Sequence, residues 1–245
     1  MTLSPEETRR YARHLVLKGI GGAGQQKLKA ARVLVIGAGG LGSPVIAYLA
    51  AAGVGTLGVV DDDKVSLSNL QRQVVHRTAD IGGPKTASAG AFVGGLNPHV
   101  TFVAHDTHLS AENAEAIERS YDIVVDGTDN FETRRAAAEA AAALGLPLVS
   151  GAVSMFDGQV TVFAPHLARA DGLPSPGFRD LYPETPSPED MPSCEAVGVL
   201  GAVTGVIGTL MAMEAIKLVT AIGDPLIGRL LLYDGRAARF TELAF

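Results

Sequence analysis

A glycine-rich run in the first quarter of the chain has the residue types and spacing to hold phosphate groups. Gly37-Ala38-Gly39-Gly40-Leu41-Gly42 fits the pattern G-x-G-x-x-G and follows a β-branched run at 32–36. Glycines at these positions let backbone amides approach a phosphate at the positive end of the following helix. Asp61 stands 19 residues beyond Gly42, at the end of the next predicted strand, where a carboxylate can accept a ribose hydroxyl. A tight turn without a ligand is the simpler alternative, and the pattern by itself favours a dinucleotide.

Polar side chains after Asp61 favour a triphosphate over a dinucleotide. The stretch continues through Asp63 to Ser68-Asn69-Leu70-Gln71-Arg72-Gln73, so amide and guanidinium groups follow the ribose-binding acid closely. Lys85 stands at the start of the next predicted helix, where its ammonium can bind phosphate as a compact charge. Arg72 and Lys85 could instead be solvated surface charges. Taken together, the two cations indicate transferase chemistry rather than hydride transfer.

Asp129 and Asn130 supply the remaining polar groups of the predicted site. They follow a predicted strand at 122–126, at the carboxyl edge of a sheet where ligands collect. A carboxylate at this edge can hold Mg²⁺ against phosphate oxygens. The simpler alternative is that Asp129 caps the helix predicted to begin at Phe131.

The elements that must position these residues alternate between strands and helices. We predict strands at 32–36, 56–60, 100–104 and 121–126, and helices at 41–52, 84–96, 110–119 and 131–144. This alternation is typical of a parallel sheet covered on both faces. Beyond Pro147, runs at 148–153 and 159–163 flank Asp157-Gly158, which predicts a hairpin turn. The fold class is therefore a Rossmann-like, doubly wound α/β fold, whose mainly parallel sheet is continued by antiparallel strands.

The two ends of the chain complete this fold. Ser4-Pro5-Glu6-Glu7 is a capping box, which predicts a helix to about Lys18, and a short helix follows at 25–31. Runs at 226–233 and 237–243 predict a closing hairpin. Seven of the 13 prolines lie at 165–192, which indicates a long irregular connection that we expect to be functional or mobile.

Composition excludes several classes of protein. The 245 residues are 47% hydrophobic and carry a net charge of −6, so a large core is available, whereas nucleic-acid binding is disfavoured. The first residues show no secretory signal. Residues 196–213 are uncharged for long enough to span a membrane, but a core helix that uses its glycines for close packing is the favoured interpretation. We therefore expect a cytoplasmic protein without a membrane span.

Several motifs, in order along the chain, resemble those of the MoeB/ThiF family of adenylyltransferases, which act on ubiquitin-like sulfur carriers. They are Arg10-Tyr11-Ala12-Arg13-His14, Gly37 to Gly42, Val65-Ser66-Leu67-Ser68-Asn69-Leu70-Gln71-Arg72-Gln73, Gly127-Thr128-Asp129-Asn130 and Gly198-Val199-Leu200-Gly201. The Ser68–Gln73 run is far more specific than the glycine pattern. The resemblance covers nearly the whole chain.

The resemblance implies a reaction and a set of ligands. The carrier's C-terminal Gly-Gly carboxylate would attack the α-phosphate of ATP, giving an acyl-adenylate and pyrophosphate. The nucleotide ligands would be Gly37, Gly39, Gly40, Gly42, Asp61, Asp63, Ser68, Asn69, Arg72, Gln73, Lys85, Asp129 and Asn130. Asp129 would hold Mg²⁺, and Arg13 would reach the phosphates from the other subunit of a homodimer. The chain would form one adenylation domain over 1–245, with N-terminal helices at 4–31, a nucleotide-binding half at 32–150 and a carrier-binding half at 151–245.

Cysteine content departs from the family pattern. Relatives commonly bind a structural zinc through two C-x-x-C pairs, whereas the corresponding stretches at 175–180 and 240–245 contain no cysteine. We therefore expect no zinc, and packing of Phe178 and Tyr182 with the C-terminal hairpin in its place. The single cysteine, Cys194, matches one that some relatives use for a thioester or acyl-persulfide, and a merely packed thiol is the alternative.

Two other functions remain open at this point. An NAD-dependent oxidoreductase is the alternative that the glycine pattern allows. A catalytically silent module that binds a ubiquitin-like protein is the other, but such a module would have no need of Arg72, Lys85 and Asp129 together.

Overall fold

A single mixed sheet of eight strands organises the chain. The computed structural model describes residues 2–169, 172–184 and 197–245, and the strands lie in the order β3-β2-β1-β4-β5-β6-β7-β8. The strands are β1 (Arg32–Ile36), β2 (Thr56–Val60), β3 (Thr101–His105), β4 (Ile123–Asp126), β5 (Leu148–Ser154), β6 (Asp157–Phe163), β7 (Arg229–Asp234) and β8 (Arg239–Ala244). Strands β1 to β5 are parallel, and β6 to β8 continue the sheet in antiparallel pairs. The predicted doubly wound fold is confirmed.

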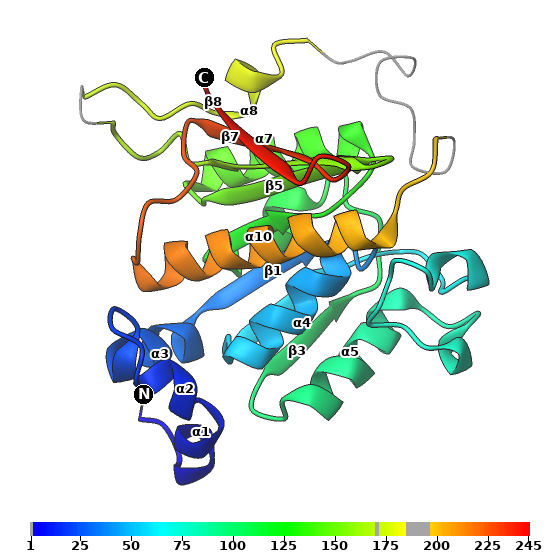
Figure 1. Cartoon of the computed structure of the whole chain (residues 1–245), viewed down its shortest axis with the longest axis vertical. Coiled ribbons are helices and arrows are strands. Elements are labelled where there is room, and N and C mark those ends of the chain that lie inside the picture. The colour runs from blue at the N-terminus through cyan, green and yellow to red at the C-terminus, as the bar shows by residue number, and fades with distance from the viewer. Residues whose placement is uncertain (1, 170–171, 185–196) are drawn as a thin grey trace.

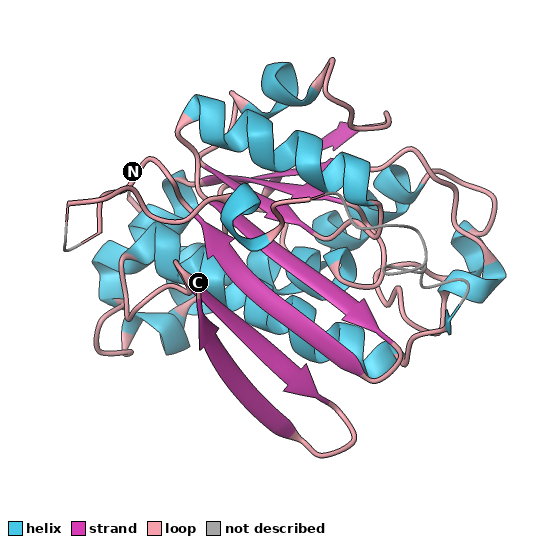
Figure 2. Cartoon of the chain, turned by 90° about the horizontal axis from the view of Figure 1, so that it is seen from above, coloured by secondary structure: helices cyan, strands magenta, loops and turns pink. Residues whose placement is uncertain are grey.

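Helices lie on both faces of this sheet (Figures 1 and 2). The α-helices are α1 (Pro5–Arg10), α2 (Ala12–Leu15), α3 (Gly21–Ala30), α4 (Gly42–Ala52), α5 (Lys85–Leu96), α6 (Ala114–Glu118), α7 (Phe131–Leu144), α8 (Phe178–Leu181) and α10 (Gly201–Thr220), and the 3₁₀-helices are η1 (Leu67–Asn69) and η2 (Thr78–Asp80). One core cluster joins the inner faces of α4, α5 and α10 to the sheet, and a second joins α6 and α7 to its other face. The predicted helix at 110–119 is shorter than expected, and the one predicted at 25–31 begins four residues earlier.

The order of the strands creates a crevice beside β1. From β1 the chain winds to β2 and β3 on one side, and β4 then pairs with the other side of β1. Loops that leave β1 and β4 therefore diverge, and this is where doubly wound folds bind ligands. Gly37 has a φ of +88°, and a Cβ added to it would lie 3.3 Å from the carbonyl oxygen of Gly127. The two loops are thus in close contact where the crevice begins.

The turn between β5 and β6 differs from the sequence prediction. We predicted a turn at Asp157-Gly158, but those residues open β6, and the turn lies at Met155-Phe156. Met155 takes a φ of +48°, which is unusual for a residue with a side chain. Gly158 is needed for packing instead, because a Cβ there would lie 2.3 Å from the Ile207 side chain.

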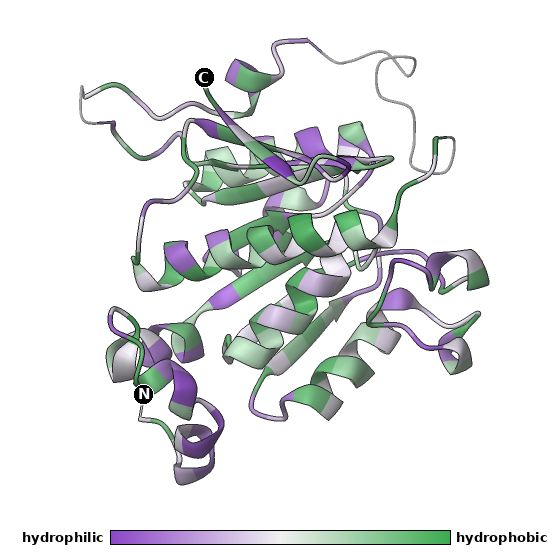
Figure 3. Cartoon of the chain, viewed as in Figure 1, coloured by the Kyte–Doolittle hydropathy of each residue, from purple (hydrophilic) through white to green (hydrophobic). Residues whose placement is uncertain are grey.

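Helix α10 packs closely against α4 and the sheet. Cβ atoms added to Gly201 and Gly208 would lie 2.3 Å from the carbonyl oxygen of Gln71 and from the Pro44 ring, respectively. By length and composition alone α10 could span a membrane. It runs across the molecule with apolar residues along its length (Figure 3), and Ile207 and Met211 are fully buried in the core. This position agrees with the predicted core helix.

The N-terminal helices lie at the amino ends of the strands. The capping box at Ser4 is present, but the predicted helix to Lys18 breaks at Tyr11, where α1 ends and α2 begins. The Tyr11 ring fills the space beside Gly53, at the end of α4 that is remote from the glycine turn. Helices α1 to α3 therefore lie beyond the amino ends of the parallel strands (Figure 1), at the end of the sheet opposite to the glycine turn.

Aromatic rings pack together in the two stretches where the resemblance implied that relatives carry zinc ligands. The Phe178 ring lies 5.7 Å from Phe163 and 4.9 Å from Tyr182, and Phe245 lies 6.2 Å from Phe163. Phe163 thus contacts both of the stretches in which the zinc ligands of relatives were expected.

Candidate active site

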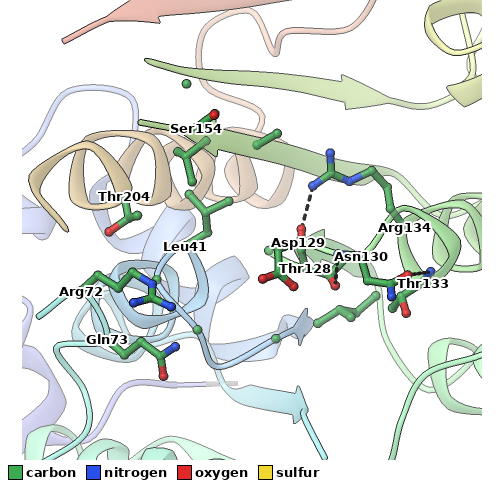
Figure 4. Close-up of a pocket in the computed structure, with 18 of the residues that line it drawn as sticks. Leu41, Arg72, Gln73, Thr128, Asp129, Asn130, Thr133, Arg134, Ser154 and Thr204 are labelled. Atoms are coloured by element: carbon green, nitrogen blue, oxygen red, sulfur yellow. Dashed lines mark hydrogen bonds between the residues drawn. The ribbon is translucent and has the colours of Figure 1, made fainter. Parts of the chain in front are cut away.

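A pocket of about 890 Å³ lies at the carboxyl ends of the parallel strands and extends over β6 to β8. Of the predicted site residues, the pocket is lined by Gly37, Gly39, Gly40, Asp61, Asp63, Asn69, Arg72, Gln73, Lys85, Asp129 and Asn130. They come from loops after β1, β2 and β4 and from the start of α5. Figure 4 shows Arg72 and Gln73 on one side of the glycine turn and Asp129 on the other.

The glycine turn presents free backbone amides to the pocket. Within the described residues, the amides of Gly39 and Gly40 donate no hydrogen bond. The neighbouring Ala38 amide instead donates to Asp61 Oδ2 at 2.7 Å. Free amides at the start of a helix attract anions. A Cβ on Gly40 would lie 3.0 Å from the Thr204 side chain, so any other residue here would have to displace that side chain.

Asp61 is a buried carboxylate that organises the turn. Its second oxygen accepts the Asp63 amide at 2.9 Å. Burial raises the pKa of Asp61, whereas the charge of Lys85 and the Ala38 amide oppose this shift. Asp61 thus holds the glycine turn in addition to lining the predicted ribose position.

Lys85 is held by the same acidic loop. Its side chain is 7% exposed, and Nζ lies 2.7 Å from Asp63 Oδ2 and 3.9 Å from Asp61 Oδ1. The Lys85 ammonium is therefore buried and paired, and the alternative that Lys85 is a solvated surface charge is wrong. A phosphate entering the pocket would compete with the exposed Asp63 carboxylate for this cation.

Arg72 and Gln73 lie across the pocket from Asp129. Arg72 Nη1 donates to the Ser68 carbonyl oxygen at 3.2 Å, and no carboxylate pairs with Arg72 among the described residues. Gln73 is 4% exposed, and its Oε1 lacks a hydrogen-bond partner within that same part of the chain. An arginine without a carboxylate partner and an unsatisfied buried amide are typical of a site that awaits a polar ligand.

Asp129 does not cap a helix. Asn130 is the N-cap of α7, and its Oδ1 accepts the Thr133 amide at 3.1 Å. The Asp129 carboxylate faces the pocket and has no hydrogen bond or ion pair to the described residues. A free carboxylate beside a phosphate site suits Mg²⁺, which takes one or two carboxylates together with phosphate oxygens.

A buried ion pair supports the loop that carries Asp129. Asp126 and Arg134 are buried, and Arg134 Nε lies 2.9 Å from Asp126 Oδ2. Arg134 Nη2 also donates to the carbonyl oxygens of Thr128 and Gly151, at 2.7 and 2.8 Å. Ser150 donates to Asp126 at 2.9 Å. Burial raises the pKa of Asp126, and the Arg134 charge opposes that shift. This network ties the loop after β4 to β5.

Glu118 is a second buried acid near Asp126, and its raised pKa predicts that stability depends on pH. It is fully buried, neither carboxylate oxygen has a hydrogen-bond partner among the described residues, and burial followed by the Asp126 charge raises its pKa to about 9. An acid whose folded pKa is raised binds its proton more tightly when folded. Stability is then lost as pH rises from the unfolded value of 4.5 towards 9.

We expect Glu118→Gln to remove this loss. The urea midpoint of the wild type should fall as pH rises from 5 to 9, and the variant's midpoint should fall less. Glu115→Gln, on the exposed face of α6, is the matched control and should keep the wild-type slope. Parallel slopes for Glu118→Gln and the wild type would show that Glu118 does not titrate in this range.

Three of the predicted residues that the structure describes do not line the pocket. Gly42 is a packing position, because a Cβ there would lie 1.8 Å from the Gly37 carbonyl oxygen. Ser68 contributes its carbonyl oxygen to Arg72, because Arg72 Nη1 donates to it at 3.2 Å. Arg13 is exposed on α2, at the opposite end of the strands. Cys194 lies outside the described residues.

The pocket also contains residues that the sequence analysis missed. They include Thr128, His108, Arg134, Ser154, Gln159 and Arg239. Gln159 and Arg239 lie on antiparallel strands, where polar residues are common, so no local pattern indicated a role for them. Only Thr128 could have been predicted to line the pocket, because it lies between Gly127 and Asp129 in a motif that follows β4.

The fold and this pocket define a doubly wound α/β protein with a glycine-rich turn at its ligand crevice. The ThiF family model matches residues 11–245. The chain belongs to the ThiF family, which confirms the resemblance seen in its motifs.

Similar proteins agree with this membership. The chain is 49% identical over 243 residues to a sulfur carrier protein adenylyltransferase of Thermus thermophilus, covering 99% of this chain and 89% of the relative. It is 46% identical to the SAMP-activating enzyme E1 of Haloferax volcanii, covering 100% and 88%. A probable adenylyltransferase/sulfurtransferase MoeZ of Mycobacterium tuberculosis is 50% identical, but the chain spans only 58% of its length.

Solved structures show the same fold at lower identity. Escherichia coli MccB in complex with ATP superposes with a TM-score of 0.81 at 18% identity, covering 99% of this chain and 73% of that chain. PaaA superposes with a TM-score of 0.77 at 21% identity, covering 99% and 75%.

Proposed function

We propose that this chain is an adenylyltransferase that uses ATP to activate the C-terminal carboxylate of a small ubiquitin-like sulfur carrier protein ending in Gly-Gly. One observation carries the proposal: a single pocket gathers free glycine-turn amides, Arg72, Lys85 and the unpaired carboxylate of Asp129. The names of the close relatives support the same activity. We further propose that the chain works in the cytoplasm as one adenylation unit.

The chemistry needs alignment and charge neutralisation rather than a general base. A C-terminal carboxyl has a pKa of about 3.5, so the carrier's nucleophile is already ionised at neutral pH. One of its oxygens bonds to the α-phosphorus of ATP, the bond from that phosphorus to the bridging oxygen breaks, and the electron pair leaves with pyrophosphate. Backbone amides of Gly39 and Gly40 and the side chains of Arg72 and Lys85 would hold the phosphates in line. Mg²⁺ at Asp129 would supply further neutralisation of phosphate charge.

The carrier and the nucleotide would enter from different sides of the pocket. The nucleotide would lie over β1, β2 and β4, and the carrier tail would cross the part lined by Gln159, Tyr233 and Arg239. Packing of Phe178 and Phe245 on Phe163 supports our expectation that this region holds together without zinc. Carriers for molybdopterin synthesis, thiamine synthesis and tRNA thiolation are the candidates.

The decisive experiment is ATP–pyrophosphate exchange with each candidate carrier. We expect exchange with at least one carrier ending in Gly-Gly, and none when its last glycine is deleted. Tight binding of NAD(H) without exchange would instead identify an oxidoreductase. Carrier binding without exchange would identify a silent binding module.

We also propose that Arg13 completes the pocket of a second subunit. Helix α4 is 11 residues long, or about 16 Å, and it separates the end where Tyr11 packs from the glycine turn. An arginine so placed cannot serve its own pocket. The resemblance implies a homodimer in which it serves the partner's.

Mixing two inactive variants tests this arrangement. Arg13→Ala and Lys85→Ala should each lose most exchange activity, but a mixed dimer contains one pocket with both groups intact. Random reassortment should therefore restore about a quarter of wild-type activity, since half the dimers are mixed and each has one working site. Arg10→Ala, which removes an exposed arginine of α1, is the control and should stay active unmixed. Mixing without recovery would contradict a shared site.

A further inference from the structure

His76 is a buried histidine that links the glycine turn to the helix carrying Lys85. The His76 residue is only 6% exposed. Nε2 lies 2.9 Å from the carbonyl oxygen of Ala38, inside the glycine turn. Nδ1 lies 2.9 Å from Ser88 Oγ on α5, one turn beyond Lys85. Ala38 is thus held at both ends, by Asp61 at its amide and by His76 at its carbonyl group.

The hydrogen atoms in this chain can be counted. Ser88 Oγ donates to Asp80 Oδ2 at 2.7 Å, and Asp80 also accepts the Arg77 amide at 2.9 Å. These bonds lower the pKa of Asp80, so its carboxylate is ionised at neutral pH and can only accept. The single hydroxyl hydrogen of Ser88 is therefore committed to Asp80.

The same count fixes both ring nitrogens of His76. A carbonyl oxygen only accepts, so Nε2 must carry a hydrogen atom to bond Ala38. Ser88 Oγ has no hydrogen left for the ring, so Nδ1 must also carry one to bond it. All bonds are satisfied together only if His76 is an imidazolium.

We propose that His76 is a positioning residue that, as an imidazolium, holds the glycine turn at a set distance from Lys85. Loss of the Nδ1 hydrogen would leave lone pairs of His76 Nδ1 and Ser88 Oγ facing each other. Ser88 would then have to break its hydrogen bond either to His76 or to Asp80. The turn and α5 would then lose their connection, and ATP binding would weaken. This role in ATP binding rests on the proposed function, whereas the charge state of the ring does not.

The charged groups around His76 act in opposite directions. Asp61 after β2 and Asp80 in η2 favour the imidazolium, as does the Ala38 carbonyl group, whereas Lys85 on α5 disfavours it. Burial is the largest influence and lowers the pKa of His76 below the ordinary histidine value, so without a nucleotide the imidazolium forms on the acid side of that value. Binding of triphosphate beside Lys85 would add negative charge and favour the imidazolium, so the ring should hold its second proton more tightly in the ATP complex.

Nitrogen-15 NMR of the histidine rings in the full chain tests the charge state without any assay of activity. In a titration from pH 8 to 5.5, both His76 nitrogens should become protonated towards the acid end, because burial lowers the pKa of the ring. The ring should lose its Nδ1 hydrogen at lower pH in Ser88→Ala than in the wild type. A neutral His76 with one protonated nitrogen throughout pH 5.5–8 would overturn the proposal, whether or not the chain adenylates a carrier.

Kinetics test the positioning role. In exchange assays the wild-type KM for ATP should rise about tenfold as pH passes through the His76 titration, with a smaller change in kcat. His76→Gln keeps one donor for Ala38 and cannot titrate, so its KM should be flat with pH and lie below that of His76→Ala. Thr86→Ala, which removes a neighbouring hydroxyl of α5, should keep the wild-type profile. Identical pH profiles for Ser88→Ala and the wild type would overturn the role.

Discussion

Replacing Asp129 by asparagine is expected to lower the rate of ATP–pyrophosphate exchange at least ~100-fold, because the site loses the carboxylate that we propose holds Mg²⁺ beside the phosphates. The side chain makes no bond to the described residues, and Asn130 rather than Asp129 caps α7. The substitution should therefore leave the free energy of unfolding within ~0.5 kcal/mol of the wild type. A large loss of activity with unchanged stability distinguishes a ligand from a structural residue.

Asp106→Asn is the matched control for that experiment. Asp106 directly follows β3, and Asp129 lies three residues beyond the end of β4, but Asp106 is exposed and does not line the pocket. It should keep wild-type exchange. If Asp129→Asn also kept wild-type exchange over a range of Mg²⁺ concentrations, the proposed metal-binding role of Asp129 would be wrong.

The largest loss of stability is expected for Arg134→Met. Removing one member of a buried ion pair leaves the other charge uncompensated, which costs about 3–5 kcal/mol. Here the Asp126 carboxylate would remain buried, and the carbonyl oxygens of Thr128 and Gly151 would each lose a donor. The loop that carries Asp129 should loosen as well, so exchange activity should fall even where the variant is still folded.

Urea unfolding of three variants tests whether the loss of stability comes from the uncompensated Asp126 charge. Arg135→Met on the same helix breaks only a half-exposed pair with Glu139, so it should cost no more than ~0.5 kcal/mol. Adding Asp126→Asn to Arg134→Met removes the stranded charge and should recover part of the lost stability. A loss below ~1 kcal/mol for Arg134→Met would show that the pair does not hold the loop.

Local patterns predicted much of the fold and of the candidate site. Alternating strand and helix signals placed β1, β2 and α7 at the observed residues, because each signal depends on neighbours in the chain. The glycine pattern and the acid after β2 each sit at a strand end. Parallel strands bring their carboxyl ends to one edge, so these residues converge in any fold of this class.

The errors arose where a distant contact decided the local structure. Asp157-Gly158 is a strong turn signal, yet Gly158 is required by the Ile207 side chain of α10 and the chain turns at Met155 instead. Gly42 fits the phosphate-binding pattern, yet its contact is the Gly37 carbonyl group. Arg134 looks like an ordinary polar residue of an alanine-rich helix, and nothing near it in sequence reveals the buried Asp126.

The sequence by itself determined the fold class, the glycine turn and the polar residues that follow each parallel strand, since these depend on periodicity and spacing along the chain. The tertiary structure alone decided which of those groups remain free to meet a ligand. Asp129 is unpaired because Asn130 takes the cap, and Lys85 is engaged because Asp63 folds back onto it. The bond between His76 and Ala38 likewise joins residues 38 positions apart. Such pairings depend on which buried donors and acceptors the packing brings together, and chain order does not contain that information.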